Sequence, residues 1–362
     1  MSFPTEQKIT GREVTAYYRP VRTVGSGTDG IVILYQRHKY EYRDNPRQVA
    51  AKVSRDAGGM GAIMREARML RKLAADCLHI VRFLGEVHKF PSPRNHTILL
   101  EYCTLGDLLH YKSTISVEGV VPEVFIWNAF AQLSKALDYL HNGPARCSGW
   151  TPIAHCDIKA ANILLCPGTH YTPLLPDASP VVKLTDFARA KEIPKGEKTG
   201  VYGTWLYLPP EKPDITPCGD VWAIGGIVHW LALDAPPVDY VQHAKMYVNR
   251  HTYCGNKDRM FEEVPCRVFP IHLSREAWLQ EFETTTGTAI LPYQPIHSHA
   301  YSSELNKWMT KALEYDPSRR ITAKQLVEAM VPIGEREIED YNRQHFPLRY
   351  TKGRESNVRT LE

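Results

Sequence analysis

Short runs of β-branched and aromatic residues alternate with turn residues over the first third of the chain. Two of them, Ile31–Tyr35 and Val49–Val53, have the length and composition of strands. Two more, Phe83–Val87 and Thr97–Tyr102, come after a segment with helical spacing. In that segment, Ile63–Leu73, apolar residues recur every three or four positions. The pattern predicts a small β-rich unit with one main helix.

After Gly106 the apolar positions change to helical spacing. The clearest example is Glu123–His141, in which leucines and a phenylalanine line one face. Two strand-like runs, Asn162–Leu165 and Val181–Leu184, interrupt the helices. A last helix is predicted for Thr322–Met330, whose first residue is a suitable N-cap. We therefore predict an α+β protein with a small strand-rich lobe followed by a larger, mainly helical lobe.

The most apolar run of the chain, Val221–Leu233, contains two glycines and a histidine. It is shorter than the roughly 20 apolar residues that a bilayer-spanning helix needs. We predict a buried core helix here and expect no membrane association.

Composition narrows the function classes. Hydrophobic residues make up 43% and charged residues 23%, as in a folded globular protein. A net charge of +4 is too small to indicate a nucleic-acid partner. The eight cysteines form no C-x-x-C pair, and Met1–Pro20 lacks the pattern of a signal peptide. We predict an intracellular protein with reduced thiols, cytoplasmic and/or nuclear.

A glycine-rich loop lies between the first predicted strands. Gly25, Gly27 and Gly30 form a G-x-G-x-x-G pattern, which lets backbone amides approach phosphate groups. Two sites use this pattern, a dinucleotide site and a kinase glycine loop. In a dinucleotide site a helix follows the glycines, whereas here the strand-like run Ile31–Tyr35 follows. That order favours a hairpin folded over a nucleotide.

Lys52 ends the second predicted strand, where an unpaired ammonium group would be costly to bury. Glu66 lies on the following helix and is its natural partner. The alternative is a surface lysine and a solvated glutamate, and the pair alone does not decide between the two.

The segment His155–Asn162 reads His-Cys-Asp-Ile-Lys-Ala-Ala-Asn. It resembles the catalytic loop of protein kinases, H-R-D-x-x-x-x-N. The resemblance implies that Asp157 orients the substrate hydroxyl, that Asn162 binds magnesium, and that Lys159 neutralises charge on the transferred phosphoryl group.

Further motifs follow in the order that kinases have. Asp186-Phe187-Ala188 resembles the metal-binding D-F-G motif, and Gly203–Glu211 resembles the end of the activation segment. Arg320 matches the late arginine that pairs with that glutamate in kinases, and Asp220–Gly225 resembles the start of the buried helix that braces the kinase catalytic loop. Because the motifs run in order from Gly25 to Arg320, the chain is identified as resembling the eukaryotic protein kinase superfamily, with a serine/threonine kinase catalytic domain.

The resemblance implies a bilobal protein-kinase fold with a small antiparallel N-lobe and a larger helical C-lobe. We place the kinase domain at residues 18–335, with the N-lobe at 18–102 and the C-lobe at 103–335. The C-lobe contains an insertion near 236–301. Residues 1–17 are expected to form an N-terminal extension and 336–362 a charged tail.

The resemblance also implies ATP and Mg²⁺ as cofactors and assigns the residues that bind them. Lys52 and Glu66 join the catalytic set, and Asn162 and Asp186 are the metal ligands. The phosphates are expected to contact Gly25, Gly27, Gly30 and Lys52. The adenine is expected to lie against Val32, Ala50 and the gatekeeper Leu100, and to bond the hinge backbone at Glu101 and Cys103. Asp107 is expected to contact the ribose.

Lys159 and the Gly203-Thr204 pair resemble serine/threonine kinases, so we expect protein substrates with Ser/Thr hydroxyls, with dual specificity left open. An upstream kinase or regulator is a further expected partner, and we expect no nucleic acid and no membrane. Thr199, Tyr202 and Thr204 are candidate phosphorylation targets.

Two positions depart from the family pattern. Cys156 replaces the arginine before the catalytic aspartate, and Ala188 replaces the glycine after Asp186-Phe187. These departures are the basis of one alternative, a pseudokinase acting as a nucleotide-binding scaffold. A small-molecule phosphotransferase with a kinase-like fold is a second alternative.

Overall fold

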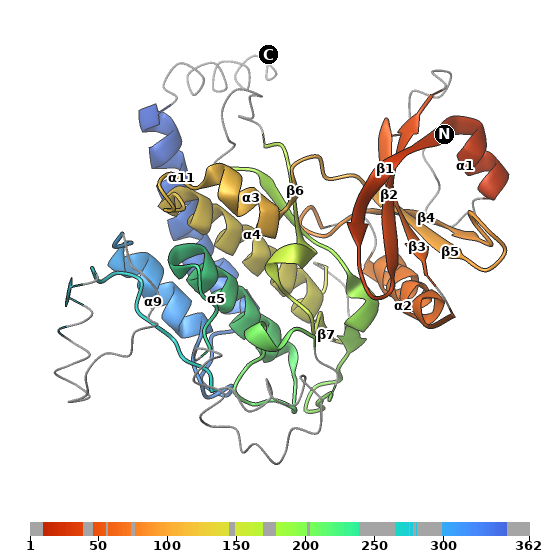
Figure 1. Ribbon diagram of the computed structural model, residues 1–362. Helices are drawn as coiled ribbons and strands as arrows, with labels where there is room; N and C mark the ends of the chain where they lie inside the picture. Colours follow the sequence, from red (N-terminus) through yellow and green to blue (C-terminus); the bar gives the residue numbers. More distant parts are fainter. Residues whose placement is uncertain are drawn as a thin grey trace, which may run out of the picture.

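A computed structural model gives the arrangement of the chain (Figure 1). The structure describes residues 10–38, 46–55, 57–73, 77–144, 149–168, 179–200, 203–238, 265–274, 276, 277, 280 and 299–345. A strand-rich lobe and a larger helical lobe lie side by side, with strand β6 near their junction. The predicted α+β, bilobal architecture is confirmed.

The N-lobe contains one five-stranded antiparallel sheet in the order β1-β2-β3-β5-β4. Its elements are α1 (Gly11–Tyr17), β1 (Tyr18–Ser26), β2 (Gly30–Arg37), β3 (Gln48–Ser54), α2 (Ala57–Leu73), β4 (Phe83–His88) and β5 (His96–Glu101). Adjacent residues of β3 point to opposite faces of the sheet, as the strand period of two requires. Ala50 therefore joins the main core, whereas Val49 and Ala51 join a smaller apolar cluster.

The smaller cluster also includes a helix that lies before the predicted boundary at residue 18. Helix α1 precedes that boundary, and its Val14 is 2% exposed within the cluster. Thr10 and Glu13 form a capping box that fixes the start of the helix. Residues 10–17 therefore pack as part of the N-lobe, although their polar sequence indicated an extension.

The C-lobe is built on the two buried helices α4 and α5, which contact one another. Its elements are β6 (Gly106–Asp107), α3 (Leu108–Ile115), α4 (Glu123–Asn142), β7 (Ile153–Ala154), η1 (Ala160–Asn162), β8 (Ile163–Cys166), β9 (Val181–Leu184), η2 (Phe187–Arg189), β10 (Lys191–Glu192), η3 (Trp205–Tyr207), α5 (Pro217–Leu233), α9 (Ser303–Ala312), α10 (Ala323–Gln325), the π-helical η4 (Leu326–Met330) and α11 (Val331–His345).

The apolar run Val221–Leu233 lies within α5, which is buried on nearly all sides. The prediction of a core helix is therefore confirmed. Among the described residues, no helix combines the length and apolarity that crossing a membrane requires.

The C-terminal helices continue past the predicted end of the domain. Thr322 caps α10 through a capping box with Gln325, and the helical path continues through η4 and α11 to His345. Gly334 packs on Trp127 of α4, where an added Cβ would lie 3.0 Å from the ring. The predicted boundary at residue 335 thus falls inside a packed helix.

Most of the predicted insertion at 236–301 lies outside the described residues. The described parts attach to the C-lobe core. The backbone N–H of Phe269 donates to Nε2 of His229 on α5, and the Tyr301 hydroxyl donates to the Val121 carbonyl at 3.0 Å.

Candidate active site

Lys52 on β3 connects the two lobes. Its Nζ lies 2.6 Å from Glu66 Oε2 on α2 and 2.8 Å from Asp186 Oδ1, which follows β9. The backbone N–H of Phe187 donates to the other oxygen of Glu66. The predicted pair of Lys52 and Glu66 is therefore formed, and Asp186 completes a three-residue cluster.

Burial and charge act against each other in this cluster. Burial alone would lower the pKa of Lys52, but the carboxylates of Glu66 and Asp186 outweigh it and raise that pKa. Burial raises the pKa of Glu66. Burial opposes ionisation of Asp186 too, yet the Lys52 ammonium group prevails and lowers the pKa of Asp186. Lys52 and Asp186 are therefore held as a charged pair.

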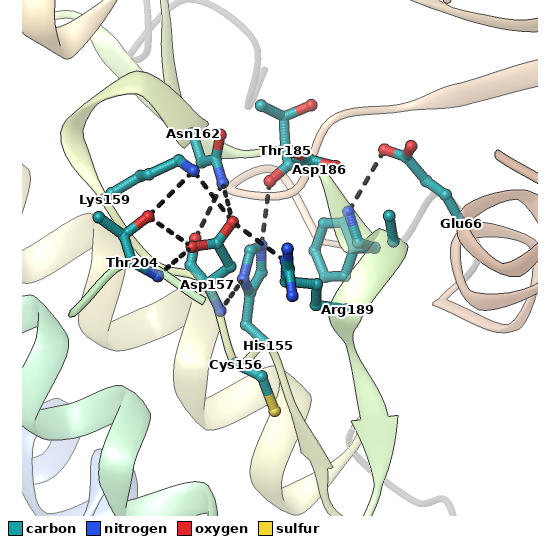
Figure 2. A network of polar contacts seen from close by, with 12 residues as sticks. Glu66, His155, Cys156, Asp157, Lys159, Asn162, Thr185, Asp186, Arg189 and Thr204 are labelled. Carbon is teal, nitrogen blue, oxygen red and sulfur yellow. Dashed lines mark hydrogen bonds and ion pairs between the residues drawn. The ribbon is translucent and has the colours of Figure 1, made fainter. Parts of the chain in front are cut away.

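The catalytic-loop residues converge on the carboxylate of Asp157, which is 6% exposed (Figure 2). Lys159 Nζ lies 3.1 Å from Asp157 Oδ2. The Asn162 amide donates to the Asp157 carbonyl at 2.9 Å and to its Oδ2 at 3.3 Å. The 3₁₀ turn η1 separates Lys159 from β8 and holds Asn162 at the start of that strand. The structure therefore places the three predicted loop residues around one carboxylate.

Thr204 belongs to this site, which the sequence reasoning missed. Its backbone N–H and its hydroxyl both donate to Asp157 Oδ1 at 2.9 Å, and Lys159 Nζ donates to the hydroxyl at 3.1 Å. Gly203 makes this approach achievable, because a Cβ there would lie 2.0 Å from Asp157 Oδ1. The Gly203-Thr204 pair was the sequence signal for this contact, whereas the sequence predicts Thr204 as a phosphorylation target.

The engaged hydroxyl makes Thr204 a poor phosphorylation target in this conformation. Of the other two predicted targets, Thr199 is partly buried and pairs through its backbone with Ile215. Tyr202 lies outside the described residues.

Asp220, on the first turn of α5, holds the backbone of the catalytic loop in place. Its carboxylate accepts from the backbone N–H of His155 at 2.7 Å and of Cys156 at 3.1 Å. His141 Nε2 lies 3.3 Å from the same carboxylate. Cys156 has a φ of +65°, and the bonds from Asp220 help hold this strained backbone conformation.

The two departures from the family pattern are accommodated differently. The Cys156 side chain is buried, and burial, followed by the charge of Asp220, raises the pKa of its thiol. An arginine from another segment, Arg189, lies near the catalytic carboxylate, with its Nε 3.9 Å from Asp157 Oδ2. Ala188 lies in the turn η2, and the left-handed backbone of this segment falls on Asp186, at φ +66°, rather than on Ala188. The extra Cβ therefore meets no backbone conflict.

The glycine loop is a hairpin between β1 and β2, as predicted. The N–H of Gly27 donates to the carbonyl of Gly30 at 2.9 Å. A Cβ on Gly30 would lie 2.1 Å from the Val53 carbonyl oxygen, so this position needs glycine. A strand and not a helix follows the loop, which excludes the dinucleotide-site alternative.

The predicted apolar contacts lie on three neighbouring strands. Val32, Ala50 and Leu100 belong to the main core cluster, with Ala50 paired to Leu100 across β3 and β5. Leu164 on β8 is half-buried and packs against the same cluster, between the fully buried Ile163 and Leu165.

The hinge residues have protein partners besides the expected nucleotide. The Glu101 carboxylate pairs with Lys183 at 2.8 Å and accepts from the Arg82 N–H at 2.7 Å, and the Glu101 N–H donates to the Arg82 carbonyl at 3.0 Å. The Cys103 carbonyl accepts from Gly106 N–H at 3.2 Å. Asp107 caps α3 by accepting from the His110 N–H and also contacts the His110 ring. A ribose contact at Asp107 would have to share this carboxylate.

Asn162 and Asp186 fit a magnesium site. Carboxylate and amide oxygens are the ligands that Mg²⁺ prefers in proteins. The Asn162 side-chain nitrogen makes both of the bonds described above, which turns the amide oxygen the other way. Lys52 bonds one oxygen of Asp186, and the Asp186 side chain remains 30% exposed. The oxygen donors that this ion requires are therefore available.

A buried ion pair supports the end of the activation segment. Arg320 binds both carboxylate oxygens of Glu211, at 2.7 and 2.8 Å. Arg320 was the matching position in the sequence, and this pairing is confirmed.

Comparison with known proteins agrees with this geometry. The family model described as "Protein kinase domain" matches residues 18–331. "Mitogen-activated protein kinase kinase kinase 20" of Arabidopsis thaliana is 32% identical over 213 residues, covering 56% of this chain and 55% of the relative. "Serine/threonine-protein kinase 36" of Pongo abelii is 29% identical over 225 residues, covering 61% of this chain and 15% of the relative. "Mitogen-activated protein kinase kinase kinase 10" of Mus musculus is 31% identical over 160 residues, covering 41% of this chain and 16% of the relative.

The chain thus spans 55% or less of the length of these relatives. The family match itself is broader than these alignments, because it runs from β1 to the start of α11. It includes the lysine cluster of Lys52, Glu66 and Asp186, the catalytic loop and the activation segment. The chain belongs to the protein kinase domain family.

Proposed function

We propose that this protein is an ATP-dependent serine/threonine kinase that transfers the γ-phosphoryl group to hydroxyls of protein substrates. The observation that carries the proposal is the assembled site. Lys52 pairs with Glu66 and Asp186 across the lobes, while Asp157, Lys159 and Thr204 form one hydrogen-bonded group. A kinase needs both arrangements together, because phosphoryl transfer is catalysed mainly by positioning and electrostatics.

ATP would bind between the lobes. The apolar side chains of Val32, Ala50 and Leu100 offer faces for the adenine, and the backbone of Glu101 and Cys103 offers hydrogen bonds. Gly25, Gly27 and Gly30 would bring backbone amides over the phosphates. Lys52 would hold the α- and β-phosphates, and Asp107 would share its carboxylate with the ribose.

Magnesium, bound by Asn162 and Asp186, would supply charge neutralisation between the phosphates. The chain's own residues act on the substrate. Asp157 orients the hydroxyl and takes its proton as the oxygen bonds to the γ-phosphorus. The bond from that phosphorus to the β–γ bridging oxygen breaks, and ADP leaves with the electron pair. Lys159 stabilises the charge on the transferred group.

The preference for serine and threonine rests on Lys159 and Thr204. The lysine lies two residues after Asp157, and the threonine hydroxyl bridges the two side chains. Together they set the position of the catalytic carboxylate relative to an incoming hydroxyl. We also propose an intracellular location, cytoplasmic and/or nuclear, and regulation by an upstream kinase or another regulator.

The test is phosphoryl transfer from labelled ATP with magnesium to a generic basic protein, beside the Asp157→Asn variant. We expect label on serine and threonine, and a rate about 10³-fold lower in the variant. Phosphoamino-acid separation checks the hydroxyl preference. ATP binding without transfer in the unmodified protein would instead support the pseudokinase alternative. Transfer to small molecules alone would support the phosphotransferase alternative.

A further inference from the structure

A group of metal-ligating side chains lies on the β4–β5 hairpin, outside the candidate active site. Glu86 and His88 are two residues apart on β4, so their side chains lie on the same face of the sheet. His96 on β5 is the direct cross-strand partner of His88. Directly opposed residues on one sheet face have neighbouring side chains, which brings the two imidazoles together beside one carboxylate.

The donor atoms are spaced as ligands of one ion would be. His96 Nε2 lies 3.3 Å from Glu86 Oε2, and His88 Nε2 lies 3.6 Å from Glu86 Oε1. One donor atom from each residue lies within 4.8 Å of the other two. A tetrahedral zinc ion with bonds of about 2.1 Å has ligand atoms about 3.4 Å apart. Only small side-chain movements would therefore bring the three donors onto one ion.

The surroundings hold these ligands in place. Arg71 Nη2 lies 2.8 Å from Glu86 Oε1, and the His96 N–H donates to Ser54 Oγ at 2.9 Å. Ligating carboxylates are commonly oriented by such outer contacts. Glu86 can keep Arg71 on Oε1 while it offers Oε2, the oxygen nearer to His96. The Arg71 contact is to Oε1 and leaves the second oxygen of this carboxylate available.

Burial differs across the group in a way that suits an ion. The His96 side chain is 3% exposed and Glu86 15%, whereas His88 is 49% exposed. The exposed edge at His88 leaves a path for the ion and room for water as a fourth ligand.

We propose that Glu86, His88 and His96 form a binding site for a divalent transition-metal ion, Zn²⁺ in particular. Two imidazoles and one carboxylate suit zinc, whereas Mg²⁺ and Ca²⁺ prefer oxygen ligands alone. The site is separate from the magnesium ligands Asn162 and Asp186, which lie in the C-lobe.

The site adjoins an ion pair between α2 and the sheet. Lys52, Ile98 and Glu86 are successive register partners across β3, β5 and β4, so they share one face. Lys52 binds Glu66 of α2, and Glu86 binds Arg71 of the same helix. An ion at Glu86 would therefore lie beside the Arg71 contact of the same helix that carries Glu66.

The test is calorimetric titration of the full chain with Zn²⁺, in parallel with the His88→Gln variant. His88 is half-exposed, so this change should leave the fold intact, which circular dichroism checks. The matched control is His345→Gln, an exposed histidine on α11. We expect the variant to lose one equivalent of zinc, or to bind it at least tenfold more weakly, and the control to bind as the unmodified protein does. Glu86→Gln should weaken the same equivalent.

Cobalt(II) gives a second readout. We expect the unmodified protein and the control to show the strong visible absorption of four-coordinate Co²⁺, and His88→Gln to lack it. Equal zinc stoichiometry and affinity in the unmodified protein and His88→Gln would overturn the proposal, because the zinc would then be bound by other histidines or cysteines. No zinc binding to the unmodified protein would overturn it too. Neither result depends on kinase activity, so this site can fail while the proposed function holds.

Discussion

Two ion clusters of similar geometry differ in what surrounds them. In the lysine cluster, Lys52 lies 2.6 and 2.8 Å from Glu66 and Asp186. In the supporting pair, Arg320 lies 2.7 and 2.8 Å from the two oxygens of Glu211. The Arg320 side chain is fully buried, donates also to the carbonyls of Glu314 and Cys218, and stacks on Trp222. Asp186, by contrast, is 30% exposed.

The difference separates a structural ion pair from one prepared for a ligand. A buried charge that is engaged by a counter-ion and by backbone carbonyls stabilises one conformation, and removing its partner leaves it uncompensated. A partly exposed carboxylate with an oxygen to spare can bind a cation or a phosphate-bound ion. Loss of one negative charge should therefore lower activity in the lysine cluster and lower stability in the pair of Arg320 and Glu211.

The largest effect is expected for Asp186→Asn, measured as the rate of phosphoryl transfer. We expect this rate to fall about 10³-fold, because the change replaces the carboxylate proposed to bind magnesium with a neutral amide. The midpoint of chemical denaturation should change little, since Lys52 keeps Glu66 as a partner. A variant that unfolds readily but retains activity would contradict this assignment.

Glu211→Gln tests the supporting pair with the same kind of change. We expect the free energy of unfolding to fall by about 3–5 kcal/mol, because the buried Arg320 charge loses its counter-ion. Denaturant titration of the purified variant measures it. If stability is unchanged and only activity falls, the pair is not the structural element described here.

Thr204→Val removes one hydroxyl between Asp157 and Lys159. A hydrogen bond to a charged group contributes about 1.5–3 kcal/mol, so we expect a rate reduction of about 10- to 100-fold. Thr204→Ser keeps the hydroxyl and serves as the control. Equal rates in the two variants would show that the hydroxyl contacts do not position Asp157.

The smallest effect concerns stability in acid. Lys52 lowers the pKa of Asp186, so the folded protein binds fewer protons there than the unfolded chain. This contribution to stability is present above the ordinary aspartate pKa and is lost as pH falls through the lowered value. Denaturation at a series of acidic pH values should therefore show a smaller pH dependence for Asp186→Asn than for the unmodified protein. Identical pH dependence would mean that this pairing adds no stability.

The predicted strands and helices agree with the structure where apolar periodicity is strong. The run Val49–Val53 became β3, and Glu123–His141 became α4 with one residue more. At the two ends of the described domain the apolar signal is weak, because α1 and α11 are polar sequences that pack through few side chains. Val14 is the one buried residue of α1, and a single apolar contact leaves no periodic signal.

The family pattern, the order of the lobes and the charged residues of the site could be read from the sequence. They depend on local spacing, such as the four residues between Asp157 and Asn162. The approach of Thr204 and Arg189 to Asp157, and the shared contact of His88 and His96 with the Glu86 carboxylate, became visible only in the folded chain. Those contacts depend on strand register and on how distant segments pack, and neither is encoded in the spacing of neighbouring residues.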